Sequence, residues 1–202
     1  MSRFRLLLGT KNPGKVEEAS EILAVVDEEL ELLSYRDIDF PDVEETGDTY
    51  TANSLKKARV ISQETGLPVL SDDSGLEVSA LNGAPGPRSA RFAGPDASDE
   101  QNLSLLLCRL EGLKQRDARF VTVATLYVSS QERYTARGVL EGKITRSPEG
   151  DSGFGYDPVF VPEGSEKTLA QLGEEKKNEI SHRRRALEKI KDELKAVLRK
   201  SS

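Results

Sequence analysis

The 202-residue sequence predicts an α/β fold, because strand-like and helix-like periods alternate along it without an internal repeat or a low-complexity tract. Two long runs rich in Val, Thr and Tyr, at 118–130 and 133–145, meet at "SSQE" and predict an antiparallel hairpin. The C-terminal segment predicts a helix that Ser181 caps and that carries the apolar stripe Leu187, Ile190, Leu194 and Val197. We expect residues 1–202 to form one domain.

The N-terminal elements follow from local patterns in chain order. Residues 3–9 predict a first strand, which includes the apolar residues Leu6, Leu7 and Leu8 and ends at a glycine. Apolar residues then recur at helical spacing up to residue 26, which predicts a helix. The stretch "ELELLSY", at 29–35, predicts a second strand.

Three further elements are expected before the hairpin. A predicted helix over 49–65 stops at Gly66, a residue type favoured just beyond helix ends. The stretch "LPVLSD", at 67–72, predicts a short buried strand that ends in two carboxylates. A helix over 98–111 begins at Ser98, with an Asp and a Glu in its first turn, as the helix dipole favours.

Composition narrows the class of protein. Charged residues make up 32% of the chain and hydrophobic residues 36%, and the net charge of −6 argues against extended nucleic-acid or membrane binding. The single Cys108 excludes an internal disulfide, and its apolar surroundings predict a buried side chain in a reducing compartment. The N-terminal run "RFRLLLG" is too short for a signal peptide or a membrane span, so we expect a cytoplasmic protein.

Four segments fit neither period, and we look for function there. The first is "LLLGTKNPGKVEE", in which Gly9, Gly14 and Lys15 match the P-loop pattern G-x-x-x-x-G-K. The next residue is Val16, where a P-loop has the Ser or Thr that binds magnesium. Phosphate binding at a helix N-terminus and a plain strand-to-helix turn with a solvated lysine both fit this loop.

The second segment is "SDDSG", at 71–75. Adjacent carboxylates at the end of a buried strand are costly unless a positive charge neutralises them, and a divalent cation is the usual solution. Because neighbouring strand residues point to opposite faces, only one of Asp72 and Asp73 faces such an ion unless a turn begins there. An Asp-Ser-Gly turn is the alternative. Glu44 and Glu45, in "DVEETGD", are further candidate ligands or part of a solvated acidic loop.

The third and fourth segments carry aromatic and basic residues. In "GDSGFGYDPVF", at 150–160, Phe154 and Tyr156 suit stacking on a planar ring, or they fill the core of a packed loop. The segment "EKKNEISHRRRAL", at 175–187, carries His182 and the densest positive charge of the chain. An anion site fits it better than an RNA patch, because no stacking aromatics are interleaved with it.

Together these segments resemble one family, the inosine triphosphate pyrophosphatases, which act on non-canonical purine nucleoside triphosphates. The resemblance runs in order through "TKNPGK", "EETGDTY", "SDDSGL", "GAPGPRSARFAG", "GFGYDPVF" and "EKKNEISHR". It implies a two-lobed single domain with a long mixed β-sheet flanked by helices, a homodimer, a Mg²⁺ cofactor, and hydrolysis of ITP, dITP and XTP to monophosphate and pyrophosphate. Such a reaction keeps deaminated bases out of DNA and RNA.

The resemblance also assigns roles to residues. Asp73 matches the proton acceptor and metal ligand, and Glu44 is ranked as a second metal ligand because Ala52 stands where many relatives carry Glu. Substrate contacts carry over to the phosphate loop, to the residue after Asp73, to the base loop and to the C-terminal basic group. These residues are Thr10, Lys11, Asn12, Pro13, Gly14, Lys15, Ser74, Phe154, Gly155, Tyr156, Asp157, Lys177, His182 and Arg183.

Selection of the base must depend on the purine 6-position, where inosine has a keto oxygen and adenine an amino group. Arg183, His182 and the amides of residues 154–157 are the available donors. Three rivals remain: a P-loop NTPase, which Val16 disfavours, a nucleic-acid-binding module using Arg183–Arg185, which the net charge disfavours, and a Maf-like pyrophosphatase acting on other nucleotides.

Overall fold

The computed structural model describes residues 3–201 and contains a six-stranded sheet with strand order β2-β1-β3-β4-β5-β6. Strand β1 pairs in parallel with β2 and β3, whereas β5 pairs antiparallel with β6, so the sheet is mixed as expected. The strands are β1 (Phe4–Leu8), β2 (Leu30–Leu33), β3 (Val69–Val78), β4 (Asp117–Tyr127), β5 (Arg133–Ile144) and β6 (Phe160–Pro162). The helices are α1 (Pro13–Leu23), α2 (Tyr50–Thr65), α3 (Asp99–Arg109), α4 (Leu169–Leu172), α5 (Glu174–Ile180) and α6 (His182–Ser201), with short 3-10 turns η1 (Ser79–Leu81), η2 (Gly86–Arg91) and η3 (Asp157–Val159).

The chain divides into two compact units. Unit 1 comprises Met1–Asp73, Thr122–Gly138 and Arg183–Ser202, and unit 2 comprises Ser74–Val121 and Val139–His182. The long strands β3, β4 and β5 each contribute residues to both units. The expectation of one domain over the whole chain stays a prediction.

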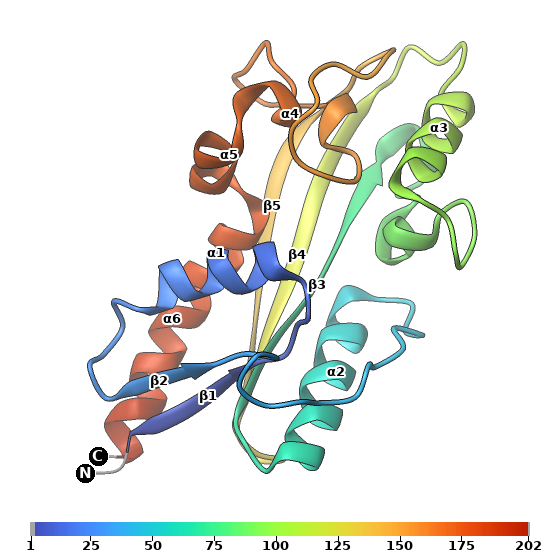
Figure 1. Cartoon of the computed structure of the whole chain (residues 1–202). Helices are drawn as coiled ribbons and strands as arrows, with labels where there is room; N and C mark the ends of the chain where they lie inside the picture. The colour runs from blue at the N-terminus through green and yellow to red at the C-terminus, as the bar shows by residue number, and fades with distance from the viewer. Residues whose placement is uncertain (1–2, 202) are drawn as a thin grey trace. The chain divides into compact units, whose positions relative to one another are not determined.

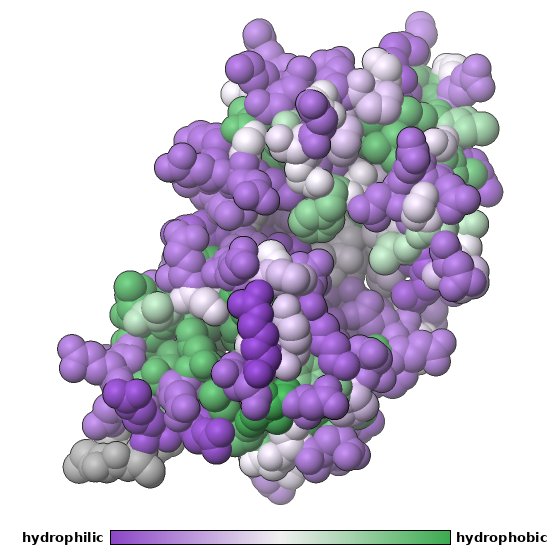
Figure 2. Space-filling view, viewed as in Figure 1, coloured by the Kyte–Doolittle hydropathy of each residue, from purple (hydrophilic) through white to green (hydrophobic). Residues whose placement is uncertain are grey.

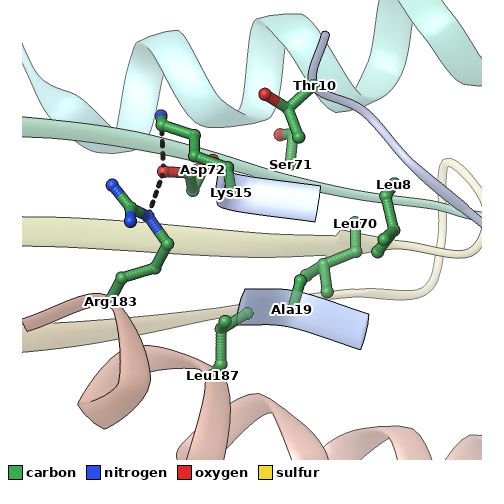
Figure 3. A pocket seen from close by; sticks show the side chains of 9 residues that line it. All are labelled: Leu8, Thr10, Lys15, Ala19, Leu70, Ser71, Asp72, Arg183 and Leu187. Atoms are coloured by element: carbon green, nitrogen blue, oxygen red, sulfur yellow. Dashed lines mark hydrogen bonds and ion pairs between the residues drawn. The ribbon is translucent and has the colours of Figure 1, made fainter. Parts of the chain in front are cut away.

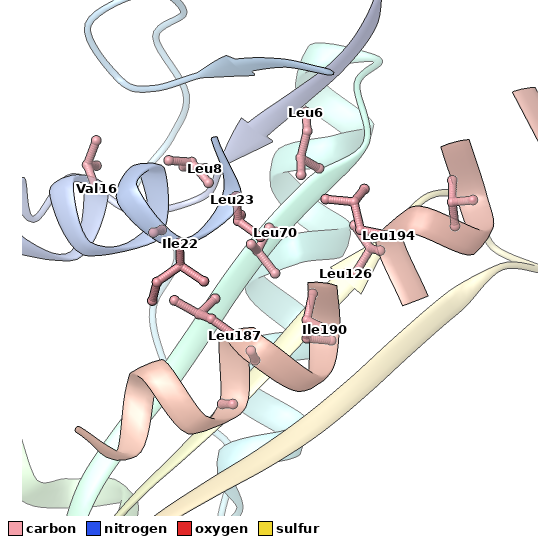
Figure 4. Close-up of a cluster of buried hydrophobic side chains, with 14 of the residues drawn as sticks. Leu6, Leu8, Val16, Ile22, Leu23, Leu70, Leu126, Leu187, Ile190 and Leu194 are labelled. Carbon is pink, nitrogen blue, oxygen red and sulfur yellow. The ribbon is translucent and has the colours of Figure 1, made fainter. Parts of the chain in front are cut away.

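Unit 1 packs helices on both faces of its part of the sheet (Figure 1). On one face, α1 and α6 bury apolar side chains against β1, β3 and β4, and Figure 4 shows Ile22, Leu187 and Ile190 among them. On the other face, Ala58 and Ile61 of α2 pack on Leu7 and Val69. The strand Leu6–Leu8 is therefore buried from both sides, as an uninterrupted apolar run predicts.

Unit 2 is built around a second apolar cluster. It joins Leu76 of β3, Phe120 of β4 and Phe160 of β6 to Leu103 and Leu106 of α3. The Phe120 and Phe160 rings lie 4.7 Å apart with a tilt of 55°, a favourable aromatic geometry. The packing of Leu103 and Leu106 on this cluster holds helix α3 against the sheet of unit 2.

Local capping explains where the helices begin and end. Helix α1 begins after Asn12, whose side chain accepts from the Lys15 amide, and α2 begins after Thr49 and ends at Gly66, as predicted. Ser98 and Gln101 form a reciprocal capping box at the start of α3. The strands of the hairpin are adjacent and joined by a short turn, which confirms that prediction.

Three sequence-based expectations are wrong. Strand β3 continues to Val78, so Asp72 and Asp73 lie inside a strand and not at its end. The first helix ends at Leu23, three residues before the expected end. Cys108 is exposed, because α3 buries the face that carries Leu103, Leu106 and Leu110 and directs residue 108 away from it.

The surface view in Figure 2 is mainly hydrophilic, and hydrophobic residues gather over the region of α1 and the neighbouring strands β1 and β2. Within residues 3–201, no helix is both long and apolar enough to cross a bilayer.

Candidate active site

The loop between β1 and α1 is built to direct Lys15 inward. Asn12 caps α1 by accepting from the Lys15 amide at 3.1 Å, and Thr10 accepts from the Asn12 amide at 3.2 Å. Pro13 occupies the first helical position, where its missing N–H costs nothing. Lys11 points instead to an acidic neighbour, with its Nζ atom 3.3 Å from an oxygen of Asp42.

A buried ionic cluster forms around Asp72 in unit 1. The Lys15 Nζ atom lies 2.8 Å and the Arg183 Nε atom 3.4 Å from Oδ2 of Asp72 (Figure 3). Arg183 also donates to Glu18 at 2.6 Å, so its guanidinium is held by two carboxylates. We call Lys15, Glu18, Asp72 and Arg183 the ionic cluster.

The ionic cluster keeps Asp72 ionised. Burial by itself favours the neutral acid, but the positive charges of Lys15, Arg183 and Lys57 outweigh it and hold the pKa of Asp72 far below its usual range. Burial also lowers the pKa of Lys15, against the pull of Asp72. Asp72 is therefore a fixed negative charge that orients two cations.

A small pocket adjoins the ionic cluster. Figure 3 shows that its walls combine polar groups with apolar side chains from α1, α6 and the strands between them. The lining residues are Leu8, Thr10, Lys15, Ala19, Leu70, Ser71, Asp72, Arg183 and Leu187.

Asp73 has a different environment from its neighbour. Successive strand residues point to opposite faces, and Asp73 accepts from the buried Asn53 amide of α2 at 2.9 Å. Burial, followed by the negative charge of Glu45, raises the pKa of Asp73 to about 6. Gly47 lets the acidic loop approach closely, since a Cβ there would lie 2.7 Å from the Asn53 oxygen that its amide contacts.

The acidic loop contributes Glu45, and not Glu44, to the surroundings of Asp73. Glu45 pairs with Lys57 at 2.5 Å and acts electrostatically on Asp73. Glu44 is exposed, and its backbone carbonyl oxygen accepts from the Lys56 ammonium at 2.7 Å and from the Thr46 amide at 3.1 Å. Among residues 3–201, no group of three or more His, Cys, Asp and Glu side chains is arranged to hold a metal ion.

The expected base loop, Phe154–Asp157, lies in unit 2, and its two aromatic side chains have different environments. Phe154 is 52% exposed, whereas Tyr156 is buried and donates its hydroxyl to the Ser89 carbonyl at 2.8 Å. The buried Asp157 carboxylate accepts from the Phe154 amide at 3.0 Å and from Lys177 at 2.5 Å. The Lys177 ammonium also lies 4.2 Å from the Phe154 ring centre, a cation–π contact.

The last expected site residues divide between the units. His182 belongs to unit 2, where its ring stacks on Phe120 at 4.9 Å and 14°. Ser74 follows Asp73 on β3 and is half-buried. The structure thus brings Lys15, Asp72 and Arg183 together in unit 1, and Phe154, Asp157 and Lys177 together in unit 2.

Three contributors, Glu18, Asn53 and Lys57, were not identified from the sequence. Glu18 lies three residues after Lys15 on α1, and Lys57 lies four residues after Asn53 on α2. Residues three or four apart share a helix face. Once Lys15 and Asn53 are candidate site residues, this spacing therefore indicates that Glu18 and Lys57 lie on the same side of their helices.

Comparison with known proteins defines the family. A model of the Ham1 family matches residues 6–193. Proteins named dITP/XTP pyrophosphatase from Exiguobacterium sp. and Geobacter sulfurreducens are each 48% identical, over 95% and 94% of this chain and 97% and 96% of their own lengths. These names confirm the resemblance noted in the sequence.

Solved structures agree with this result. A HAM1 protein from Coxiella burnetii superposes with a TM-score of 0.88 at 39% identity, covering 95% of this chain and 98% of its own. The Staphylococcus aureus Ham1 protein gives a TM-score of 0.83 at 37% identity, covering 98% and 100%. The family match, the sequence identities and the shared fold lead to one conclusion: this chain belongs to the Ham1 family.

Proposed function

We propose that this protein hydrolyses the non-canonical purine nucleoside triphosphates ITP, dITP and XTP to the monophosphate and pyrophosphate. The observation that carries the proposal is the name dITP/XTP pyrophosphatase, borne by relatives that are 48% identical over nearly their whole length. The adjacent carboxylates Asp72 and Asp73 support a hydrolytic reaction, because their environments move their pKa values in opposite directions.

The triphosphate is assigned to the positive groups of unit 1. Lys15 stands in the first turn of α1, where the helix dipole also favours an anion. Arg183 and Lys57 add positive charge around Asp72. In this account Asp72 and Glu18 orient the cations, and the phosphate oxygens take over part of their hydrogen bonds.

The donor set near Asp73 fits Mg²⁺. Burial is the main cause of the raised pKa of Asp73, repulsion from the Glu45 carboxylate adds to it, and a bound cation would offset that repulsion. Mg²⁺ uses one or two protein carboxylates together with substrate phosphates and waters, so a set of three protein ligands is not required. We therefore propose Asp73 and Glu45 as the ligands, in place of Glu44. When bound, the ion would neutralise charge on the phosphate oxygens.

Asp73 also suits the role of general base. Without the ion, the pKa of about 6 leaves Asp73 ionised at neutral pH, and a bound ion would favour the ionised carboxylate further, so Asp73 stays in the form that accepts a proton. The hydrogen bond from Asn53 fixes the direction of its carboxylate. Asp73 takes a proton from water, the water oxygen attacks the α-phosphorus, and the bond to the bridging oxygen breaks to release pyrophosphate.

The base is assigned to unit 2. Phe154 offers an exposed ring for stacking, and His182 is one side-chain donor for a keto oxygen. Lys177 is another, because its ammonium has three N–H donors and can pair with Asp157 through one of them. The amides of Phe154 and Gly155 already donate to Asp157 and Asp99, so they are not free to contact the purine. The guanidinium of Arg183 is likewise engaged by carboxylates.

The resemblance further suggests a homodimer that acts in the cytoplasm. Light scattering on the purified chain tests the first point, since a dimer has twice the 22.2 kDa mass of the chain. Fractionation of the source cells tests the second.

The test of the proposed function is a nucleotide panel with Mg²⁺ and separate detection of phosphate and pyrophosphate. We expect ITP, dITP and XTP to give pyrophosphate about tenfold faster than ATP or more, the scale of one mismatched hydrogen-bonding edge. Phosphate as the product would indicate a different NTPase reaction. A preference for modified pyrimidine nucleotides would favour Maf-like activity.

A further inference from the structure

The conformation of the base loop depends on a residue outside it. The Gly155 amide donates to Oδ2 of Asp99 at 2.8 Å, across 56 positions of sequence. Gly155 has a φ of +60°, which other residues rarely adopt, and Gly153 has a φ of +82°. Phe154 thus stands between two glycines, and flexible glycines need an external contact to hold one conformation.

The position of Asp99 at the start of α3 suits it to accept this hydrogen bond. It is the first residue of α3, where the dipole stabilises a negative charge, and the Ser98–Gln101 capping box fixes the helix start. A hydrogen bond from an amide to a carboxylate is stronger than one between neutral groups. The carboxylate therefore presents a fixed acceptor to the Gly155 amide.

The helix that carries Asp99 is joined to the segment that contacts the next residue of the base loop, Tyr156. Asn102 of α3 is 1% exposed, accepts from the Ala93 amide at 2.8 Å and donates to the Ala90 carbonyl at 3.1 Å. Residues 86–91 form η2, which includes Ser89, and the Ser89 carbonyl accepts from Tyr156. We call α3 and η2, joined by Asn102, the bracket.

The bracket holds two successive residues of the base loop. Asp99 contacts the amide of Gly155, and Ser89 contacts the hydroxyl of Tyr156. Ser89 is itself fixed, because its hydroxyl accepts from the Leu76 amide and donates to the Gly86 carbonyl. This explains what the segment "GAPGPRSARFAG" contributes, for which the proposed reaction has no other use.

We propose that Asp99 is a positioning residue for base recognition, which fixes the Gly155 amide and thereby holds Phe154 in the orientation that accepts the purine. The inference rests on the proposed function, because it takes the base loop as the purine site. Asp99 acts through the loop and does not touch the substrate. Its removal should therefore weaken the choice of base more than it slows the reaction at saturation.

Three variants separate this role from a general effect of charge. Asp99→Ala removes both the acceptor and the charge, and Asp99→Asn keeps an acceptor oxygen but loses the charge. Glu100→Ala is the matched control, because Glu100 is exposed and provides the same charge in the same first turn. Amide hydrogen exchange at Gly155 reports the contact without using activity, and kcat and KM for ITP and ATP report recognition.

We expect Asp99→Ala to speed exchange of the Gly155 amide by about tenfold, the loss of one charge-assisted hydrogen bond. Its ratio of kcat/KM for ITP over ATP should fall about fivefold or more, mainly through a higher KM for ITP. Asp99→Asn should lie between Asp99→Ala and wild type, and Glu100→Ala should match wild type in both measurements.

Two results would overturn the inference alone, in an enzyme whose wild type prefers ITP. One is unchanged exchange at Gly155 in Asp99→Ala, and the other is faster exchange with an unchanged ITP to ATP ratio. A wild-type enzyme with no preference for ITP would overturn the proposed function and, with it, this inference. The exchange measurement would still report the contact in that case, so the two failures are distinguishable.

Discussion

Unit 1 and unit 2 use different chemistry at their candidate sites. The ionic cluster of unit 1 consists of charged side chains whose neighbours are other charges, with distances of 2.6–3.4 Å between them. The base loop of unit 2 is held largely through backbone groups, namely the amides of Phe154 and Gly155 and the carbonyl of Ser89. Positively charged side chains attract any phosphate group, whereas the conformation of a loop can favour one base over another.

This difference between the units implies that unit 1 affects the rate of hydrolysis and that unit 2 affects which base is accepted. Substitutions in the ionic cluster or at Asp73 should change hydrolysis of ITP and ATP by the same factor, because both nucleotides carry the same triphosphate. Substitutions at the base loop or at Asp99 should alter the ratio between the two nucleotides. The predictions below test this separation.

The largest effect is expected from Asp73→Asn. It removes the proposed base and a metal ligand with little change in size, so kcat should fall about 10³-fold for ITP and ATP alike. Steady-state pyrophosphate release measures the rate, and circular dichroism checks the fold. Turnover close to wild type would move the catalytic role to another residue, with Asp72 the next to test.

A large loss of stability is expected from Arg183→Ala. Arg183 is 8% exposed, and its guanidinium pairs with the carboxylates of Asp72 and Glu18. Its removal therefore leaves two buried negative charges without this partner. The free energy of unfolding should fall by about 3 kcal/mol. Arg184→Ala is the matched control, since its side chain is 32% exposed and its ion pairs are 3.9 Å long, and it should cost less than about 1 kcal/mol. Equal costs in urea unfolding would argue against the ionic cluster.

A smaller effect concerns the pH dependence of stability without metal. Because the pKa of Asp73 is about 6 in the folded protein, above its ordinary value of 3.8, the native state binds more protons and stability falls as the pH rises through that window. Asp73→Asn lacks this fall and should be about 1–3 kcal/mol more stable than wild type at pH 8. The difference should shrink below about pH 5 and on adding Mg²⁺ to wild type. Parallel stability curves in EDTA from pH 4 to 8 would contradict this.

Periodicity and capping predicted most of the fold. The β-prone runs of β1 and β4, the start of α3 at Ser98, the end of α2 at Gly66 and the stripe of α6 depend on neighbouring residues, so they are visible in the sequence. The end of β3 was not predicted, because Asp72 and Asp73 resemble a turn until their distant partners are known. The prediction that Cys108 is buried was wrong, because an apolar segment does not show which helix face is buried.

The sequence indicated candidate residues for the site but not which side chains contact one another. Motif order made Lys15, Asp73 and Phe154 candidates, and their roles stay predictions. The ion pair from Arg183 to Glu18 spans 165 positions and leaves no local pattern. For the same reason the role of Asp99 depends on tertiary contacts. The interpretation of Arg183 as a donor to the base assumed a free guanidinium, whereas two carboxylates hold it.

The kcat/KM values of Arg183→Ala for ITP and for ATP test whether unit 1 acts on phosphates without regard to the base. The measurement should be made at a temperature where the variant is folded. We predict that both values fall by the same factor, so that the ITP to ATP ratio stays within about twofold of wild type. A loss of about 1–3 kcal/mol for ITP with ATP unchanged would show that Arg183 contacts the base, and it would contradict the account.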